Sequence, residues 1–269
     1  MSGFLGFLSL RRRVWVECVV ELKEPLHVGA GKDPTSPIDL PVIRNAAGVP
    51  IIPGSTLKGF FRSYLARLLA GYSATGEREL EVEGTTIRLE PCIDSVSEGE
   101  QPAGQDKLCL LDRIFGVASP NFSLASAVKF TDAMLVNKAE DLTFKRTHVK
   151  IDSKRDAVEK RMLVNVEAVK EVLEGESTKF AFTIVFDELG DDFFKESNKL
   201  FYLLLLMLYK GIDAFLGGWK SRGYGHVTVK LSSVRYATVK DLIERRDPVE
   251  VPRDQLQKWI LDSLKGVHT

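Results

Sequence analysis

The chain has 269 residues, which is long enough to bury a substantial core in one large domain or two small ones. Hydrophobic residues make up 44% of it and charged residues 28%, and this composition excludes an intrinsically disordered protein. Lys plus Arg and Asp plus Glu both number 37, so the net charge is zero. A nucleic-acid-binding protein with this balance must gather its basic residues on one face.

The cysteines and the apolar segments indicate a cellular compartment. Three cysteines, Cys18, Cys92 and Cys109, provide no disulfide framework and suit a reducing environment. The N-terminal apolar run "FLGFLSL" precedes the basic "RRR", which is the reverse of the order in a secretory signal. The longest apolar run, residues 200–209, is too short to cross a bilayer. We therefore expect a cytoplasmic protein without a membrane partner.

The first half of the chain predicts a strand, a helix and an insertion. Residues 13–22 are rich in β-branched side chains, which favours a strand. After a Gly- and Pro-rich connection, Ser55 is expected to cap a helix that Gly71 ends. The apolar face of that helix comprises Leu57, Phe60, Phe61, Tyr64, Leu65 and Leu68. Residues 73–108 are mostly polar and are expected to form an insertion outside the core.

The second half continues this mixed pattern around one conspicuously charged segment, residues 145–169. The apolar run 198–218 predicts a buried helix that ends at Gly217 and Gly218. The other expected elements are a short amphipathic turn at 110–116, strands at 126–136, 178–188 and 226–236, and a surface helix at 253–265. This order predicts an α+β fold with a ferredoxin-like (RRM-like) βαββαβ core and long insertions. Many unrelated proteins share that core, so it indicates no function by itself.

The stretch "LGGWKSRGYGHVTV", residues 216–229, places glycines, a basic pair and aromatic residues at the start of a strand. Glycine lets backbone amides approach a ligand closely, and Lys220 and Arg222 add positive charge at the same place. Such a loop suits an anionic phosphate backbone. A tight helix-to-strand connection with solvated basic residues explains the same composition equally well, so the loop alone does not decide between the two.

Two separate motifs carry a resemblance to a known family. The stretches "IDLPVIRN…GVPIIPGSTLKGFFRSYL" and "FLGGWKSRGYGHV" together resemble the RAMP superfamily of CRISPR-associated proteins, and within it the backbone subunit of type III (Csm-like) interference complexes. The resemblance implies a single RAMP domain over residues 1–269. Its parts would be a core at about 10–72 and 110–236, an insertion at about 73–108, a thumb-like hairpin at about 138–170 and a C-terminal helix at about 253–266.

The resemblance implies that the chain binds guide RNA through both motifs. In the first motif, Ser55, Lys58 and Arg62 would lie at one side of a helix N-terminus, where backbone amides and the helix dipole favour phosphate. In the second motif, the RNA backbone would follow the loop residues Lys220, Ser221, Arg222, Gly223, Tyr224 and Gly225. A solvated face without RNA is the alternative for Lys58 and Arg62.

The charged middle segment resembles the thumb-like hairpin of the family, which wedges between nucleotides and exposes target phosphates. Arg146 and His148 would bind RNA there. Further residues expected to line the hairpin are Lys145, Lys150, Lys154 and Arg155, with Ile151 or Met162 as apolar wedges. For each of these residues, an exposed charged excursion without RNA contact is the alternative.

Asp39 stands before "LPVIR", where the family carries the Asp that cutting of target RNA requires. A carboxylate acts there by holding a divalent metal, Mg²⁺ or another, near the scissile phosphate, or by helping to activate the ribose 2′-hydroxyl. Without the motif, Asp39 would more simply cap a turn. His27 is the competing candidate, because other RAMP proteins that process guide transcripts use a His as general acid or base.

The resemblance therefore implies a subunit that holds guide RNA and cleaves complementary target RNA in a metal-dependent way. Its partners would be both RNAs, other RAMP subunits, a large polymerase-like subunit and further copies of itself. Two alternatives stay open. One is a structural RAMP subunit that binds RNA without cutting it, and the other is a guide-processing endoribonuclease that depends on His27.

Two departures from the family pattern concern Asn45 and the cysteines. Asn45 stands where the family often has an Asp. Some family members carry a Cys/His zinc cluster in the insertion, whereas here Cys92 and Cys109 lack CxxC partners. With Asp112 as a third ligand, the tetrahedral set is still incomplete. We expect two ordinary thiols and no structural zinc.

Overall fold

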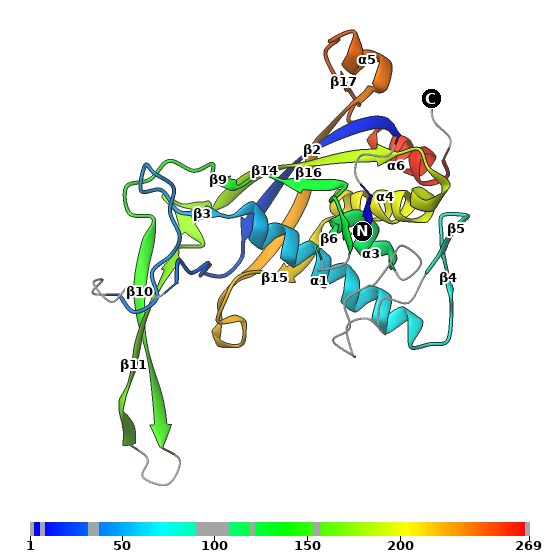
Figure 1. The fold of residues 1–269 in the computed structure, drawn as a ribbon. Coiled ribbons are helices and arrows are strands. Elements are labelled where there is room, and N and C mark those ends of the chain that lie inside the picture. The colour runs from blue at the N-terminus through cyan, green and yellow to red at the C-terminus, as the bar shows by residue number, and fades with distance from the viewer. Residues whose placement is uncertain are drawn as a thin grey trace.

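The computed structural model describes residues 3–5, 9–31, 38–89, 108–118, 122–152 and 157–266 (Figure 1). They form a mixed α/β structure around a curled antiparallel sheet of eight strands. The strand order is β15–β16–β2–β14–β9–β3, with β17 beside β16 and β8 beside β14. The strands of this sheet are β2 (Leu10–Leu22), β3 (Ile51–Ile52), β8 (Val128–Phe130), β9 (Ala133–Leu135), β14 (Lys179–Leu189), β15 (Ile212–Phe215), β16 (His226–Thr238) and β17 (Val249–Glu250).

Three long strands form the centre of the sheet. β2 pairs with β14 on one side and with β16 on the other, so that Val16 lies opposite both Ile184 and Val234. Successive side chains of a strand point to opposite faces. Every second residue of β2 from Arg12 to Leu22 is buried, and the residues between them are partly exposed. One face of the sheet is therefore covered by the rest of the chain.

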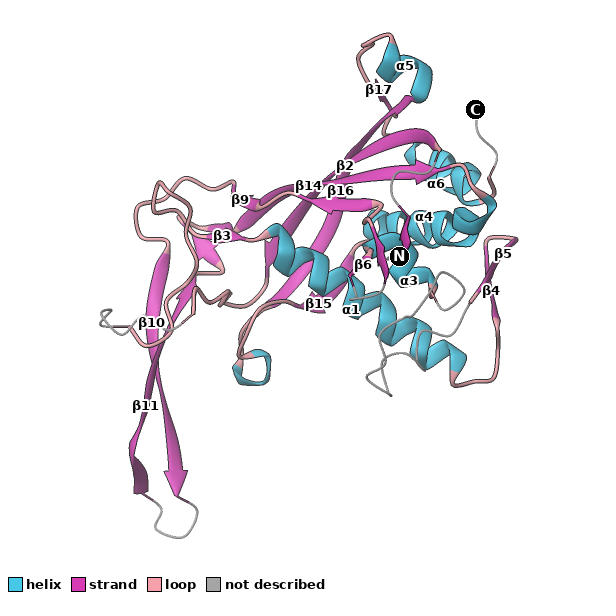
Figure 2. Ribbon diagram, in the orientation of Figure 1, coloured by secondary structure: helices cyan, strands magenta, loops and turns pink. Residues whose placement is uncertain are grey.

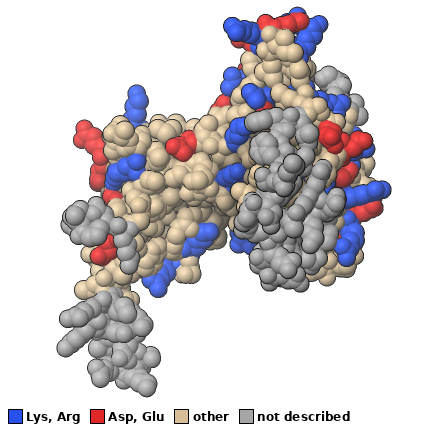
Figure 3. All heavy atoms as spheres, viewed as in Figure 1, with Lys and Arg blue, Asp and Glu red and all other residues tan. Residues whose placement is uncertain are grey.

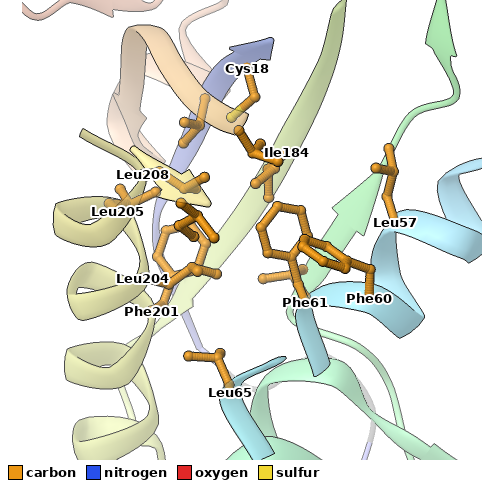
Figure 4. Close-up of a cluster of buried hydrophobic side chains, with 14 of the residues drawn as sticks. Cys18, Leu57, Phe60, Phe61, Leu65, Ile184, Phe201, Leu204, Leu205 and Leu208 are labelled. Carbon is orange, nitrogen blue, oxygen red and sulfur yellow. The ribbon is translucent and has the colours of Figure 1, made fainter. Parts of the chain in front are cut away.

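Helices cover that buried face (Figure 2). They are α1 (Gly54–Ser73), α3 (Leu110–Phe115), α4 (Lys195–Lys210) and α6 (Leu256–Leu264), while the short α5 (Val239–Ile243) lies beyond the end of β16. Figure 4 shows the contact between α1 and α4 over the sheet. The buried side chains there are Leu57, Phe60, Phe61 and Leu65 of α1, Phe201, Leu204, Leu205 and Leu208 of α4, and Ile184 of β14.

A buried charged network attaches the C-terminal helix to the sheet. Arg12 at the start of β2 forms an ion pair with Glu188 of β14, and both side chains are almost fully buried. The same guanidinium donates to the hydroxyls of Tyr202 in α4 (2.8 Å) and Ser263 in α6 (3.0 Å). The polar groups thus satisfy one another, as a buried ion pair requires.

The remaining strands form small sheets at the margins of this body. The long hairpin of β10 (Thr143–Asp152) and β11 (Ala157–Val169) projects away from it (Figures 1 and 2). The others are β1 (Gly3–Leu5), β4 (Glu79–Val82), β5 (Thr85–Arg88), β6 (Val117–Ala118), β7 (Phe122–Leu124), β12 (Val172–Leu173) and β13 (Glu176–Ser177). None of the helices in the described ranges is long and apolar enough to cross a membrane.

Three sequence predictions about elements are wrong. The helix expected over 198–218 ends at Gly211, whose φ is +96°, and Ile212–Phe215 is a strand. The first helix begins at Gly54 and continues to Ser73, so Ser55 is not its cap and Gly71 does not end it. The described part of the expected insertion is not outside the core, because Ile87 and Leu89 are buried in it.

Candidate nucleic-acid interface

The loop between β15 and β16 lies against the segment that follows β2. We call residues 216–225 the glycine loop. Its Gly218 amide donates to the His27 carbonyl (2.9 Å), and its Gly225 amide donates to the Pro25 carbonyl (2.8 Å). Gly217 and Gly225 both have a φ of +81°, and a Cβ there would lie 2.4 Å and 2.0 Å from a backbone oxygen. These two glycines are therefore required by the close approach of two backbone segments.

The basic residues of the glycine loop point away from that contact. Lys220, Ser221 and Arg222 form the exposed 3-10 turn η3 (Lys220–Arg222). Within the described part of the chain, the Lys220 and Ser221 side chains have no hydrogen-bond or ion-pair partner. The Arg222 guanidinium lies 4.4 Å from the centroid of the Trp219 ring. Gly223 has a φ of +77°, and a Cβ there would meet nothing within 4 Å, so the tip of the loop is open.

A groove separates the glycine loop from α1. One wall is formed by Gly217, Gly218 and Lys220, and the other by one flank of α1. The residues of that flank are Thr56, Gly59, Phe60, Ser63 and Arg67. They recur at the three- and four-residue spacing of one helix face. The groove thus brings the amides of the loop opposite a polar helix flank that carries one cation of its own.

The three residues of α1 that the sequence singled out lie on its other flank. Arg62 forms an ion pair with Asp112 (2.6 Å) and donates to the Gly116 carbonyl (3.0 Å), so it fastens α3 to α1. Burial lowers the pKa of the Lys58 amine, and the nearby Arg62 charge lowers it further. Ser55 is exposed in the first turn, where the side chain of Asp132 accepts from the Gly54 amide (2.8 Å).

The base of the β10–β11 hairpin contacts the glycine loop through aromatic and basic side chains. The His148 ring stacks on the Trp219 ring at 4.8 Å, and its Nε2 lies 2.8 Å from the Tyr224 hydroxyl. The Arg146 guanidinium lies 5.4 Å from the Tyr224 ring centroid. Tyr224 itself is fully buried. Partial burial lowers the pKa of His148, and the positive charges of Arg222 and Arg146 lower it further.

Asp39 is exposed and lies beside β11 of the same hairpin. Its Oδ2 accepts a hydrogen bond from the Asn165 amide (2.7 Å). The next residue, Leu40, donates its own amide to the Asn165 carbonyl (3.1 Å) and forms a parallel bridge with Val166. Asp39 is therefore fixed by backbone contacts to the hairpin, although 126 residues separate it from Asn165 in the sequence.

Glu167 holds the segment that follows Asp39. One of its carboxylate oxygens accepts from the Val42 amide (2.9 Å), and the other accepts from Arg44 (2.6 Å) and the Thr143 hydroxyl (2.8 Å). Burial alone would raise the pKa of Glu167, but these hydrogen bonds and the Arg44 charge hold it below the ordinary value. No sequence motif marked Glu167, and its position between two valine-rich stretches gave no signal.

The two faces of the hairpin are directed at different parts of this interface. Lys145 lies opposite Glu167 and Thr147 opposite Asn165, so these side chains share one face of the hairpin. Arg146 and His148 alternate with them and occupy the other face, where they contact the glycine loop. The hairpin therefore contacts the glycine loop through the side chains of one face and holds Asp39 through the backbone amide of Asn165.

His27 is buried between these parts. Its Nδ1 lies 2.7 Å from the Glu167 carbonyl oxygen, and its exposed fraction is only 5%. The ring also lies against the glycine loop, because a Cβ on Gly218 would be 3.3 Å from its Cδ2. This arrangement suits a packing and hydrogen-bonding role.

The possible metal ligands of the chain include Asn45 and the cysteines. Within the described ranges, no three His, Cys, Asp or Glu side chains converge. Asn45 accepts from the amides of Ala47 and Val49 (3.0 Å each), so it shapes a turn. Cys109 is disulfide-bonded, so the expectation that it is an ordinary thiol is wrong, whereas Cys92 lies outside the described residues.

Several predicted hairpin residues cannot be placed. Lys154 and Arg155 lie outside the described residues, and so do the side chains of Lys150, Ile151 and Met162. On the face drawn in Figure 3, acidic and basic side chains are scattered, with a group of Lys and Arg side chains between the hairpin and the body of the molecule. The basic side chains on this face are therefore interspersed with acidic ones (Figure 3).

Comparison with known proteins identifies the family of this chain. A model described as the RAMP superfamily matches residues 19–228. The CRISPR system Cms endoribonuclease Csm3 of Methanocaldococcus jannaschii is 28% identical over 228 residues, which cover 82% of this chain and 79% of that protein. A chain of a type III-B Cmr-β complex, solved by cryo-EM in its apo state, aligns with a TM-score of 0.53 and 15% identity over 81% of this chain and 96% of that one. The match to the family spans most of the sequence and both motifs of the interface, and the chain belongs to the RAMP superfamily.

Proposed function

We propose that this chain is a backbone subunit of a type III CRISPR ribonucleoprotein, where it binds guide RNA and cleaves complementary target RNA. The similarity to an endoribonuclease of a CRISPR system over 82% of the chain supports the class of complex and the reaction. The observation that carries the proposal is that one hairpin contacts both parts of the interface. It directs Arg146 and His148 to the glycine loop and holds Asp39 at the edge of β11 through the Asn165 amide.

The fold agrees with this assignment. The strand order β16–β2–β14–β9, with α1 after β2 and α4 after β14, supports our assignment of a ferredoxin-like (RRM-like) core. We assign the β10–β11 hairpin as the thumb of a single RAMP domain. The partners that we propose are guide RNA, target RNA, other RAMP subunits, a large polymerase-like subunit and further copies of this chain.

Guide RNA would lie in the groove between the glycine loop and α1. The exposed Lys220 and the Arg67 of α1 line this groove and supply positive charge on both of its sides. Backbone amides of a glycine-rich loop add donors for phosphate oxygens. Trp219 and His148, which stack on each other at the neighbouring hairpin base, add aromatic surface beside this groove.

Target RNA would be cut beside Asp39. One carboxylate oxygen accepts from the Asn165 amide, and the other has no partner in the described part of the chain. A single open carboxylate suits Mg²⁺, which is commonly held by one or two carboxylates together with water and substrate phosphates. Asp39 would hold such an ion, and the ion would supply positive charge at the scissile phosphate.

The experiment compares Asp39→Ala with His27→Ala in the assembled complex. Asp39 is exposed, so its truncation creates no cavity and should leave assembly and target capture intact. Loss of the carboxylate should lower the single-turnover cleavage rate at least about 100-fold. His27→Ala should still cleave target RNA, and cleavage by the wild type and by His27→Ala should require a divalent metal.

The conservative variant Asp39→Asn serves as a control for folding, because its side-chain oxygen still accepts from the Asn165 amide. Normal cleavage by Asp39→Ala would leave the structural-subunit alternative in place. If His27→Ala alone abolished cutting, a guide-processing activity would replace the proposal.

A further inference from the structure

Asn165 is held by its main chain and by its side chain at the point where the hairpin meets Asp39. Its backbone amide donates to Asp39 Oδ2 (2.7 Å), and its carbonyl accepts from the Leu40 amide (3.1 Å). Its side-chain Oδ1 accepts from the Thr147 hydroxyl across the hairpin (2.7 Å). Both the main chain and the side-chain oxygen are thus fixed, which sets the plane of the side-chain amide.

The remaining polar atom of Asn165 is the Nδ2 group. Among the described residues it has no hydrogen-bond partner, although the side chain is only partly exposed. Because Oδ1 is turned toward Thr147, Nδ2 is turned away from it. The two N–H donors of this group therefore lie on the hairpin face opposite to Arg146 and His148, on the same residue whose backbone amide binds the Asp39 carboxylate.

We propose that the Asn165 side-chain amide contacts the substrate and donates a hydrogen bond to a non-bridging oxygen of the scissile phosphate. The inference rests on the proposed function, since it needs the target strand at Asp39. A carboxylate next to a phosphate is repelled by it, and a neutral donor at the same place offsets part of that repulsion. A donor that is already oriented loses little freedom when the substrate arrives, and a hydrogen bond to an anionic oxygen is a strong one.

The neighbouring side chains favour phosphate as the acceptor. Lys145 and Thr147 are exposed on the same face of the hairpin as Asn165, and none of the three is an aromatic platform for a base. Farther out on this face lie the exposed Val149 and Leu163, which form a cross-strand pair. The polar end of the face, next to Asp39, therefore suits the sugar–phosphate backbone.

The first test is single-turnover cleavage by the assembled complex at saturating target RNA. Asn165→Ala removes the donors but keeps the backbone amide that fixes Asp39. The rate should fall about 10- to 100-fold, the range expected for one donor to a charged group, while the Kd for target RNA changes by less than about twofold. Thr147→Val, which keeps the β-branched shape and frees the amide to rotate, should give a smaller loss.

The second test asks whether the amide meets the phosphate itself. Target RNA is prepared with sulfur in place of each non-bridging oxygen of the scissile phosphate in turn. In one of the two diastereomers, the sulfur should slow the wild-type complex more than it slows Asn165→Ala, because the hydrogen bond is already absent from the variant. Identical sulfur effects in both complexes would overturn the contact, even if Asn165→Ala were slow.

The outcomes separate this inference from the proposed function. A wild-type rate for Asn165→Ala beside a dead Asp39→Ala would overturn the role of Asn165 and leave the function standing. A normal rate for Asp39→Ala would remove the function itself. Capture of target RNA by every variant shows that a lost rate does not come from a failure to fold.

Discussion

His148 is an ionisable residue at the contact between the hairpin and the glycine loop. Burial lowers its pKa below the ordinary value of 6.5, as do the charges of Arg222 and Arg146. The unfolded chain therefore binds more protons than the folded one once the pH is below that value. By linkage, the free energy of unfolding then falls as the pH falls through the window below 6.5, and His148 has no such effect well above it.

We expect this titration to appear in the thermal stability of the RNA-free protein. Between about pH 7 and pH 5, the Tm of the wild type should fall more steeply than that of His148→Gln. Gln does not titrate, and its amide can still donate to the Tyr224 hydroxyl. Calorimetry across this range measures both slopes, and parallel curves would mean that His148 does not contribute.

The sequence predicted the helix α1 but not which of its side chains line the groove. The predicted RNA-binding residue Arg62 instead forms an ion pair with Asp112. The groove is lined by Thr56, Ser63 and Arg67 on the other flank of the helix. Polar residues flank both sides of the buried face of an amphipathic helix. Which flank lies at the glycine loop depends on the docking of the helix on the sheet, and no pattern within the helix records that.

At the scale of the element, the glycine loop depends on two kinds of glycine. Gly225 and Gly223 have similar positive φ values, +81° and +77°. A Cβ on Gly225 would lie 2.0 Å from the Leu216 carbonyl oxygen, whereas a Cβ on Gly223 would meet nothing within 4 Å. An alanine at either position would therefore have a strained backbone, but only an alanine at Gly225 would also clash with a backbone atom.

Gly225→Ala should lower the free energy of unfolding by at least about 3 kcal/mol, because a backbone oxygen cannot move away cheaply. Gly223→Ala should cost only about 1 kcal/mol, which is the strain of a left-handed residue with a side chain. Urea denaturation measures both. Equal losses would show that the clash at Gly225 is relieved by a shift of the loop.

Elements were predictable where the residue types favour one kind of structure and less so where an apolar run suits both helix and strand. The β-branched residues of 13–22 predicted β2, and the structure places a strand there. The mostly apolar segment 198–218 contains both α4 and β15. Its division at Gly211 is set by the pairing of Ile212–Phe215 with β16, which is a tertiary contact.

Across the whole molecule, the proposed path of the guide predicts a salt dependence. Lys220 and Arg67 face the same groove from the glycine loop and from α1. Reversal of both charges should weaken RNA binding irrespective of sequence. The slope of log K against log salt should become shallower by about 1.4, since each lost phosphate contact of single-stranded RNA removes about 0.7.

The matched control reverses Lys240 and Arg246, which lie on and just after α5, away from the hairpin (Figure 1). It changes the net charge by the same amount. Fluorescence anisotropy over a range of salt concentrations measures both double variants. If the control lowered the slope equally, the RNA would respond to the total charge of the protein and would not follow the groove.

The site as a whole was only partly predictable. The two motifs identified Asp39 and the glycine loop, but Asn165 and Glu167 come from a segment in which charge was the only visible signal. They reach Asp39 through a parallel bridge between Leu40 and Val166. A single bridge between segments so far apart depends on how the loop folds in three dimensions. No local sequence pattern predicts it.

The central position of β2 has a consequence for the order in which the protein can form. Its two neighbours, β14 and β16, are synthesised more than 150 and 200 residues after it. Contacts so far apart in sequence close slowly, and they close only when most of the chain has left the ribosome. Until then β2 has two unpaired edges and an apolar face, a combination prone to aggregation. The buried Arg12 at its start, and the arginines that flank it, carry positive charges on this nascent strand and would keep it from pairing with other copies before its own partners emerge.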